Sequence, residues 1–121
     1  MPTHRIHEEK ETFYFITFTC YKWLPLLEKA EIHTYLPNWI KQLSSRGLVT
    51  CGYVMMPNHL HLLVYVQKDC KGLNSVLGEG KRFMAYEIIS RLKDKNEKSI
   101  LAQLAQSPQS HPRLEKSEGG L

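Results

Sequence analysis

The sequence has few features of secreted, membrane or disulfide-stabilised proteins. Its three cysteines are odd in number and widely spaced, and no Cys-x-x-Cys occurs, which argues for reduced thiols in a cytoplasm rather than a disulfide framework or zinc ribbon. No apolar run approaches the roughly 18 residues of a membrane span. No charged segment followed by an apolar one opens the chain as in a secretory signal. We therefore expect a cytoplasmic protein that does not enter a membrane.

The length and charge predict one basic domain. The chain has 121 residues, 42% of them hydrophobic, which is enough for one packed core. Its net charge of +4 is compatible with a polyanionic partner. We expect residues 1–12 to be a flexible N-terminus and residues 13–98 to form the domain. In residues 99–121 we expect a weak helix over 99–106 followed by a disordered tail.

Hydrophobic periodicity predicts the order strand, helix, strand, strand, helix. The strands cover residues 13–20, 48–55 and 59–67, and in the second of them Val49, Cys51, Tyr53 and Met55 alternate with Thr50, Gly52 and Val54. The helices cover residues 28–46, with a kink or break at Pro37 and a stop at Gly47, and residues 73–95. This order predicts an α+β, ferredoxin-like split βαβ fold, an antiparallel sheet with helices on one face. Nothing from Lys95 onward reads as a strand, so we expect the C-terminal part of the fold to be incomplete; either the sheet stays incomplete in one chain or a partner chain completes it.

Two histidines stand one residue apart at the start of the third predicted strand. Successive side chains of a strand point to opposite faces, so His59 and His61 share one face with Leu63 and Tyr65. The other face is wholly apolar and should meet the helices; it comprises Leu60, Leu62, Val64 and Val66. Such a pair is either two surface histidines or a two-ligand platform for a divalent ion. A third ligand must come from elsewhere, and an open site of this kind suits Mg²⁺, Mn²⁺ or a catalytic transition metal.

The helix over residues 73–95 carries polar candidates on one face. Glu79, Tyr86 and Ser90 share that face, and if the helix crosses the open side of the sheet, Glu79 is a candidate third ligand and Tyr86 a candidate nucleophile. The alternative is an ordinary solvated helix face. Basic residues on both helices are candidates for contacting the backbone of a single strand; they are Lys81, Arg82, Lys41 and Arg46. The alternative is that their charge serves only solubility.

Residues 53–64, Tyr-Val-Met-Met-Pro-Asn-His-Leu-His-Leu-Leu-Val, resemble the signature of the tyrosine transposases of small insertion sequences and their REP-associated relatives. These are HUH single-strand DNA endonucleases. Residues 15–19 and 80–88 are also similar to that family. The resemblance implies DNA transposition by a homodimer, in which His59 and His61 hold Mg²⁺ or Mn²⁺. A tyrosine hydroxyl then cleaves single-stranded or hairpin DNA through a 5′-phosphotyrosine link.

The sequence departs from that family at the nucleophile. Relatives carry the tyrosine in a late helix that reads roughly Tyr-x-x-x-Asn-Pro, and the polar residue four places after the tyrosine is the third metal ligand. Here no such motif occurs, no tyrosine follows Tyr86, and four residues later stands Ser90, a poor ligand. This pattern predicts a truncated or frame-shifted copy that keeps the metal half of the site and has lost the nucleophile half, which leaves Tyr86 only as a substitute nucleophile. Whether it is an enzyme is left open.

Two further hypotheses remain. One is a catalytically dead module that binds single-stranded or hairpin DNA without cutting it. The other is a sheet-face RNA-binding domain, which would stack bases on aromatic side chains of the strands; the candidates are Phe13, Phe15, Tyr53 and Tyr65.

Overall fold

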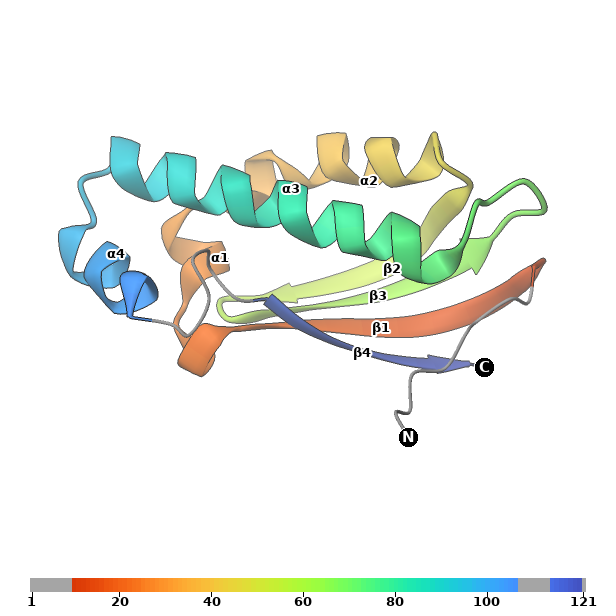
Figure 1. The fold of residues 1–121 in the computed structure, drawn as a ribbon, viewed down its shortest axis with the longest axis horizontal. Coiled ribbons are helices and arrows are strands. Elements are labelled where there is room, and N and C mark those ends of the chain that lie inside the picture. The colour runs from red at the N-terminus through yellow and green to blue at the C-terminus, as the bar shows by residue number, and fades with distance from the viewer. Residues whose placement is uncertain (1–9, 107–113, 121) are drawn as a thin grey trace.

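The computed structural model of the chain describes residues 10–106 and 114–120. Four strands form one antiparallel sheet in the order β2-β3-β1-β4 (Figure 1). The strands are β1 (Thr12–Cys20), β2 (Leu48–Met56), β3 (His59–Val66) and β4 (Leu114–Gly120). The helices are α1 (Leu26–Lys29), α2 (Leu36–Ser44), α3 (Leu73–Asp94) and α4 (Lys98–Ala105), with 3-10 turns at Tyr21–Trp23 and Ile32–Thr34.

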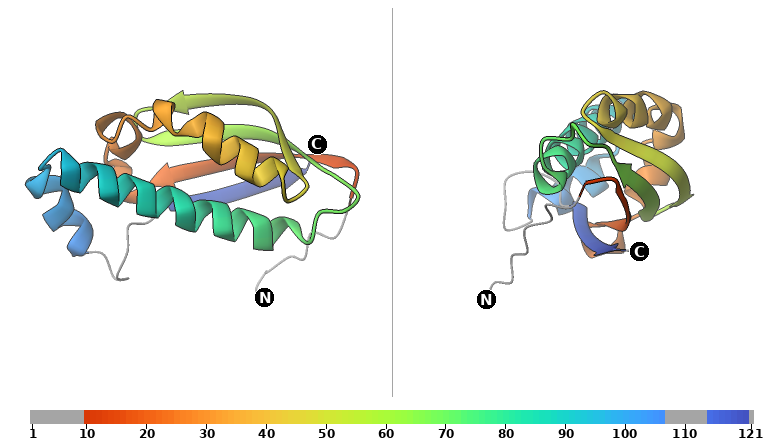
Figure 2. Two further views of the ribbon diagram at one scale, coloured as in Figure 1. Left: turned by 90° about the horizontal axis from the view of Figure 1, so that it is seen from above. Right: turned by 90° about the vertical axis from the view of Figure 1, so that its right-hand side faces the viewer.

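The helices α2 and α3 lie side by side over one face of the sheet, and within residues 10–106 and 114–120 the other face carries no helix (Figures 1 and 2). Strand β3 lies between β1 and β2 and runs antiparallel to both, so β1 and β2 are parallel to each other across it. This arrangement confirms the predicted α+β, ferredoxin-like fold with helices on one face of an antiparallel sheet. Among the residues described, no helix has the length and apolar character needed to cross a membrane.

The core lies between the helices and the apolar face of the sheet. In β3 every second residue from Leu60 to Val66 is buried, as the alternation predicts. Trp39 of α2 meets Phe18 of β1 edge to face, with ring centroids 5.8 Å apart. Its indole N–H donates to the carbonyl of Gly80 at 2.8 Å. A Cβ on Gly80 would lie 2.9 Å from Leu43, so the missing side chain lets α3 approach α2 closely.

The predicted helix over residues 28–46 is divided into shorter pieces. Glu31 adopts a left-handed φ of 51°, which separates α1 from a 3-10 turn and then α2. Pro37 lies in the first turn of α2, where its missing N–H removes no helical hydrogen bond. The break is therefore before Pro37 rather than at it. The predicted stop at Gly47 is confirmed, since this residue follows α2 with a φ of 91°.

A bulge in β2 changes which of its side chains share a face. Thr50 is opposite Val64 and Gly52 is opposite Leu63, so Cys51 is the extra residue. The prediction that Cys51 and Val49 alternate in step with Tyr53 and Met55 is therefore wrong. Beyond the bulge, it is Gly52, Val54 and Met56 that share the face of the histidines.

The sheet has a fourth strand that the sequence did not predict. Strand β4 pairs with β1 from Tyr14↔Gly120 to Cys20↔Leu114, so the expectations of an incomplete sheet and of a disordered tail are wrong for residues 114–120. Residues 107–113 and 121 lie outside the described part of the chain, as do residues 1–9 of the expected flexible N-terminus. The short helix predicted over residues 99–106 is confirmed as α4, which buries Ile100 and Leu104 in the core.

Candidate metal centre on the open face of the sheet

His59 and His61 lie together on the helix-free face of the sheet. Both are half-buried and alternate with buried leucines, so the predicted shared face is confirmed. Their ring centroids are 4.7 Å apart and the ring planes are inclined at 84°. Across the sheet, His61 is opposite Thr17 of β1 and Val54 of β2. The strand thus presents two imidazoles to the same volume of space.

Each imidazole is held through its Nδ1 atom. The Nδ1–H of His59 donates to the side-chain oxygen of Asn58 at 2.8 Å, and Nδ1 of His61 lies 3.0 Å from Oγ1 of Thr17. The Asn58 amide is oriented by its own N–H, which donates to the carbonyl of Trp23 at 3.4 Å. A histidine whose Nδ1–H is donated keeps a lone pair on Nε2 for a metal. Neither Nε2 atom has a hydrogen-bond partner within the described residues.

Backbone hydrogen bonds fix the turn that leads into the histidines. The carbonyl of Asn58 accepts from the N–H of Cys20 at 2.9 Å. The carbonyl of Pro57 accepts from the N–H groups of Leu27 and Glu28, at 3.0 and 3.3 Å. The end of β1 and the start of α1 therefore hold residues 57–58 in place. Because the two histidines are already held in position, ligand binding requires little further loss of conformational entropy.

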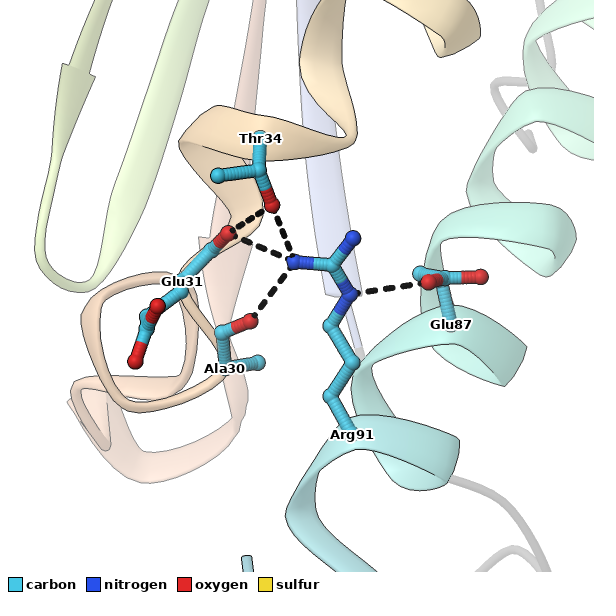
Figure 3. Close-up of polar contacts among 5 residues, drawn as sticks. All are labelled: Ala30, Glu31, Thr34, Glu87 and Arg91. Atoms are coloured by element: carbon cyan, nitrogen blue, oxygen red, sulfur yellow. Dashed lines mark hydrogen bonds and ion pairs between the residues drawn. The ribbon is translucent and has the colours of Figure 1, made fainter. Parts of the chain in front are cut away.

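Arg91 of α3 in turn holds the segment that follows α1 (Figure 3). Its guanidinium donates to the carbonyls of Ala30 at 3.2 Å and Glu31 at 2.7 Å, and also to the hydroxyl of Thr34. Its Nε–H donates to the Glu87 carboxylate at 2.8 Å. The contacts run from α3 through residues 30–34 to α1, which supports the Pro57 turn.

Two exposed aromatic rings border the histidines. The Phe15 ring stacks on His61, with centroids 5.7 Å apart and planes inclined at 16°. The Trp23 ring meets His59 edge to face at 6.0 Å. Beside His61 is a pocket of about 250 Å³, lined by Phe15, Gly52, Tyr53, Val54, His61 and Leu63.

Comparison with known proteins gives a match in structure only. No protein-family model matches the sequence, and no curated protein matches it. The whole chain superposes on a REP-associated tyrosine transposase bound to a REP hairpin, with a TM-score of 0.57 and 16% sequence identity. It also superposes along its whole length on a candidate transposase from Deinococcus radiodurans R1, with a TM-score of 0.55 and 15% identity. The chain has the fold of the tyrosine transposases. It spans 62% of the length of the REP-associated protein and 86% of the other.

In this transposase fold the predicted third ligand does not join the histidines. Glu79 lies on α3, which covers the other face of the sheet, and its carboxylate forms an ion pair with Arg46 at the C-terminal end of α2. The helix directs its apolar stripe at the sheet, so the stripe that carries Glu79 points away from it. The described residues contain no group of three His, Cys, Asp or Glu side chains that could hold a metal ion.

The predicted nucleophile and basic residues are also on the helical side. Tyr86 is exposed on α3, so within one chain the sheet separates it from His59 and His61. Lys41 and Arg46 belong to α2 or its C-terminal end, and Lys81 and Arg82 belong to α3. The structure therefore brings the two histidines together and leaves the other sequence-predicted site residues away from them.

Sequence reasoning missed the residues that orient the histidines. Thr17 lies on the open face of β1 because of the strand's alternation, which the sequence does contain. Its pairing with His61 depends on the strand register, which no local pattern specifies. No sequence pattern marks Trp23, and its approach to His59 depends on the left-handed backbone of residues 22–23.

Proposed function

We propose that this chain binds single-stranded DNA in a metal-dependent manner, as a domain for DNA transposition. One observation carries the proposal: two imidazoles on an exposed sheet face have their Nδ1 atoms engaged and their Nε2 atoms available. The sequence resemblance around the histidines and the transposase fold support the same assignment. One of the similar structures is itself described as bound to a REP hairpin.

His59 and His61 would hold a divalent ion, Mg²⁺ or Mn²⁺. Two nitrogen ligands leave most of the coordination sphere for phosphate oxygens and water, as a catalytic site requires. When bound, such an ion polarises a phosphodiester. Asn58 and Thr17 would keep the two rings in the tautomer and orientation that present Nε2, and the anchored Pro57 turn would keep the ligands from moving apart.

Strand cleavage would use a tyrosine hydroxyl. Its oxygen would release its proton to water and form a bond to phosphorus while the bond from phosphorus to the 3′ oxygen breaks, and the 3′ oxygen would take up a proton and leave as a hydroxyl. The energy of the broken bond is retained in the phosphotyrosine, so rejoining needs no other energy source. Because Tyr86 lies across the sheet from its own histidines, we propose that the attacking tyrosine is contributed by a second copy of the chain, with Tyr86 as the candidate.

The test combines binding and cleavage. The purified chain would be mixed with a labelled single-stranded hairpin DNA in Mn²⁺ or in EDTA, and denaturing gels would score covalent adducts. We expect metal-dependent binding that His61→Ala abolishes and that His33→Ala, at an exposed histidine of a 3-10 turn, leaves unchanged. Binding that is equal in EDTA and in His61→Ala would disprove the metal-dependent role.

Binding without cleavage is the second candidate function. The position of Tyr86 on the helical side of the sheet favours it. Metal-dependent binding with no adduct would identify a binding module, whereas an adduct lost in Tyr86→Phe would identify Tyr86 as the nucleophile. A matched RNA hairpin serves as competitor. Preference for that RNA would favour the sheet-face RNA-binding alternative. The exposure of Phe13 and Phe15 on the open face supports this alternative, because both rings are accessible for stacking.

A further inference from the structure

Four rings form a continuous row on the open face of the sheet, in the order Phe15, His61, His59, Trp23. Neighbouring centroids along it are 5.7, 4.7 and 6.0 Å apart. We propose that Phe15 and Trp23 are base-binding residues that hold the two unpaired bases on either side of the phosphate at the histidines. The inference rests on the proposed function, because it assumes that a single strand lies over the histidine pair.

Phe15 lies beside a space of suitable size for a base. Its side chain is 45% exposed and forms one wall of the 250 Å³ pocket next to His61. That volume is below the roughly 300–1,000 Å³ of pockets for drug-sized ligands, so it suits a single planar ring system. The bulge at Cys51 directs Gly52 toward this face, and a Cβ there would meet nothing within 4 Å. The space above Leu63 is thus left open by the absence of a side chain.

Trp23 is held in an exposed position at some energetic cost. Its side chain is 63% exposed, the largest fraction among the exposed large hydrophobic residues in the described part of the chain. Trp23 and the preceding Lys22 both have left-handed backbone angles, with φ of 58° and 49°. Non-glycine residues in that region are disfavoured and cluster at ligand sites. The bond from Asn58 to the Trp23 carbonyl ties this conformation to the residue that orients His59.

Unpaired bases are the ligand that this row fits best. Proteins that bind single strands stack successive bases on aromatic rings and hold the backbone by charge. Here the rings lie at the ends of the row, and the candidate cation site lies between them. A single strand with its phosphate at the histidines would therefore bring one base toward each ring. A protein segment would use the exposed rings and could donate hydrogen bonds to Nε2, but it would bring no phosphate to the candidate cation site.

The first measurement compares two probes of equal charge. A dA 12-mer and an abasic 12-mer carry the same phosphates, but only the first has bases to stack. In Mn²⁺, we expect the dA strand to bind at least tenfold more tightly and to quench tryptophan fluorescence. The quenching would report Trp23, because the other tryptophan, Trp39, is only 1% exposed. Equal affinity for the two strands would overturn the proposal.

The second measurement assigns the effect to the two rings. Phe15→Ala and Trp23→Ala should each weaken binding of the dA strand by about 5- to 100-fold and leave binding of the abasic strand unchanged. Phe13→Ala is the matched control, since Phe13 is on the same face of β1, is 42% exposed, and packs on Tyr65 instead of a histidine. Equal losses in the control and the two variants would overturn the assignment.

The outcomes separate this inference from the proposed function. If the chain is no metal-dependent strand binder, both probes will bind weakly and independently of Mn²⁺. If the chain binds single strands in a metal-dependent manner but the rings do not bind bases, both probes will bind in Mn²⁺. The Phe15→Ala and Trp23→Ala variants will then bind the dA strand as tightly as the unmodified chain. Self-association that disappears in Phe15→Ala and Trp23→Ala would show that the row is an interface between copies of this chain, and would also overturn the inference.

Discussion

Thr17 Oγ1 lies 3.0 Å from Nδ1 of His61, across the antiparallel pair of β1 and β3. The contact joins the first strand of the chain to the histidine pair and engages Nδ1 of His61, so Nε2 is the ring nitrogen without a partner among the described residues. Partners of this kind commonly affect metal affinity by about 10- to 100-fold. The hydroxyl of Thr17 is therefore as much a part of the candidate centre as the strand that carries the ligands.

Replacing Thr17 by valine should weaken Mn²⁺ binding by about tenfold or more. Valine keeps the shape of threonine but removes the oxygen that engages Nδ1 of His61. Mn²⁺ binding is measured by the loss of the free-ion signal in electron paramagnetic resonance. Thr19→Val is the control, because Thr19 is two residues along the same face, opposite His59. Equal effects of the two substitutions would contradict the assigned role of Thr17.

Gly47→Ala should destabilise the fold by about 1–3 kcal/mol or more. The residue has a φ of 91°, and an added Cβ would lie 2.7 Å from the Cα of Cys70, which is backbone and cannot rotate away. The free energy of unfolding is measured by urea denaturation. Gly52→Ala is the matched control: its Cβ meets nothing within 4 Å, and we expect a change within about 0.5 kcal/mol. A stable Gly47→Ala variant would contradict this account of the turn.

Arg91→Met should lower the free energy of unfolding by about 1–3 kcal/mol. The substitution removes hydrogen bonds to two backbone carbonyls and leaves the Glu87 carboxylate without its i,i+4 partner (Figure 3). Lys93→Met changes an exposed cation of the same helix and should have little effect. If the two variants unfold at the same urea concentration, Arg91 does not fasten residues 30–34 to α3.

The cysteines should differ sharply in reactivity. Burial raises the pKa of the Cys20 thiol to about 11, so at pH 8 only about one molecule in a thousand carries the reactive thiolate. Cys51 is exposed, as expected for the extra residue of the bulge. Alkylation at pH 8 followed by peptide mass spectrometry should label Cys51 first and Cys20 only after unfolding. Labelling of Cys20 at the rate of Cys51 would show that the end of β1 is not packed as described.

The histidine face and the main helices could be predicted from the sequence because they depend on local periodicity. Alternation in residues 59–66 decides which side of β3 faces the core, and a period near 3.6 does the same for α3. Together the two patterns also imply that Glu79 points away from His59 and His61. The sequence prediction kept Glu79 as a candidate because it left open which side of the sheet the helix crosses.

Other features depend on interactions between distant segments and were not predictable. Strand β4 contains Glu, Lys, Ser and two glycines, which have low strand propensity, and it forms by backbone pairing along the edge of β1. The bulge at Cys51 and the register that pairs Thr17 with His61 are likewise set by the neighbouring strands. The left-handed Glu31 is held by Arg91 of α3 and by Lys95, which directly follows α3, and no local pattern around Glu31 reveals these contacts.

The central claim is that His59 and His61 together hold one divalent ion, and Mn²⁺ binding to the purified chain tests it most directly. Electron paramagnetic resonance should find one site per chain that is lost in both His59→Ala and His61→Ala and retained in His33→Ala. Circular dichroism would verify that the variants remain folded, as the exposure of this face leads us to expect. Unchanged Mn²⁺ binding in His59→Ala and His61→Ala would contradict the claim, and with it the metal-dependent function proposed for the open face of the sheet.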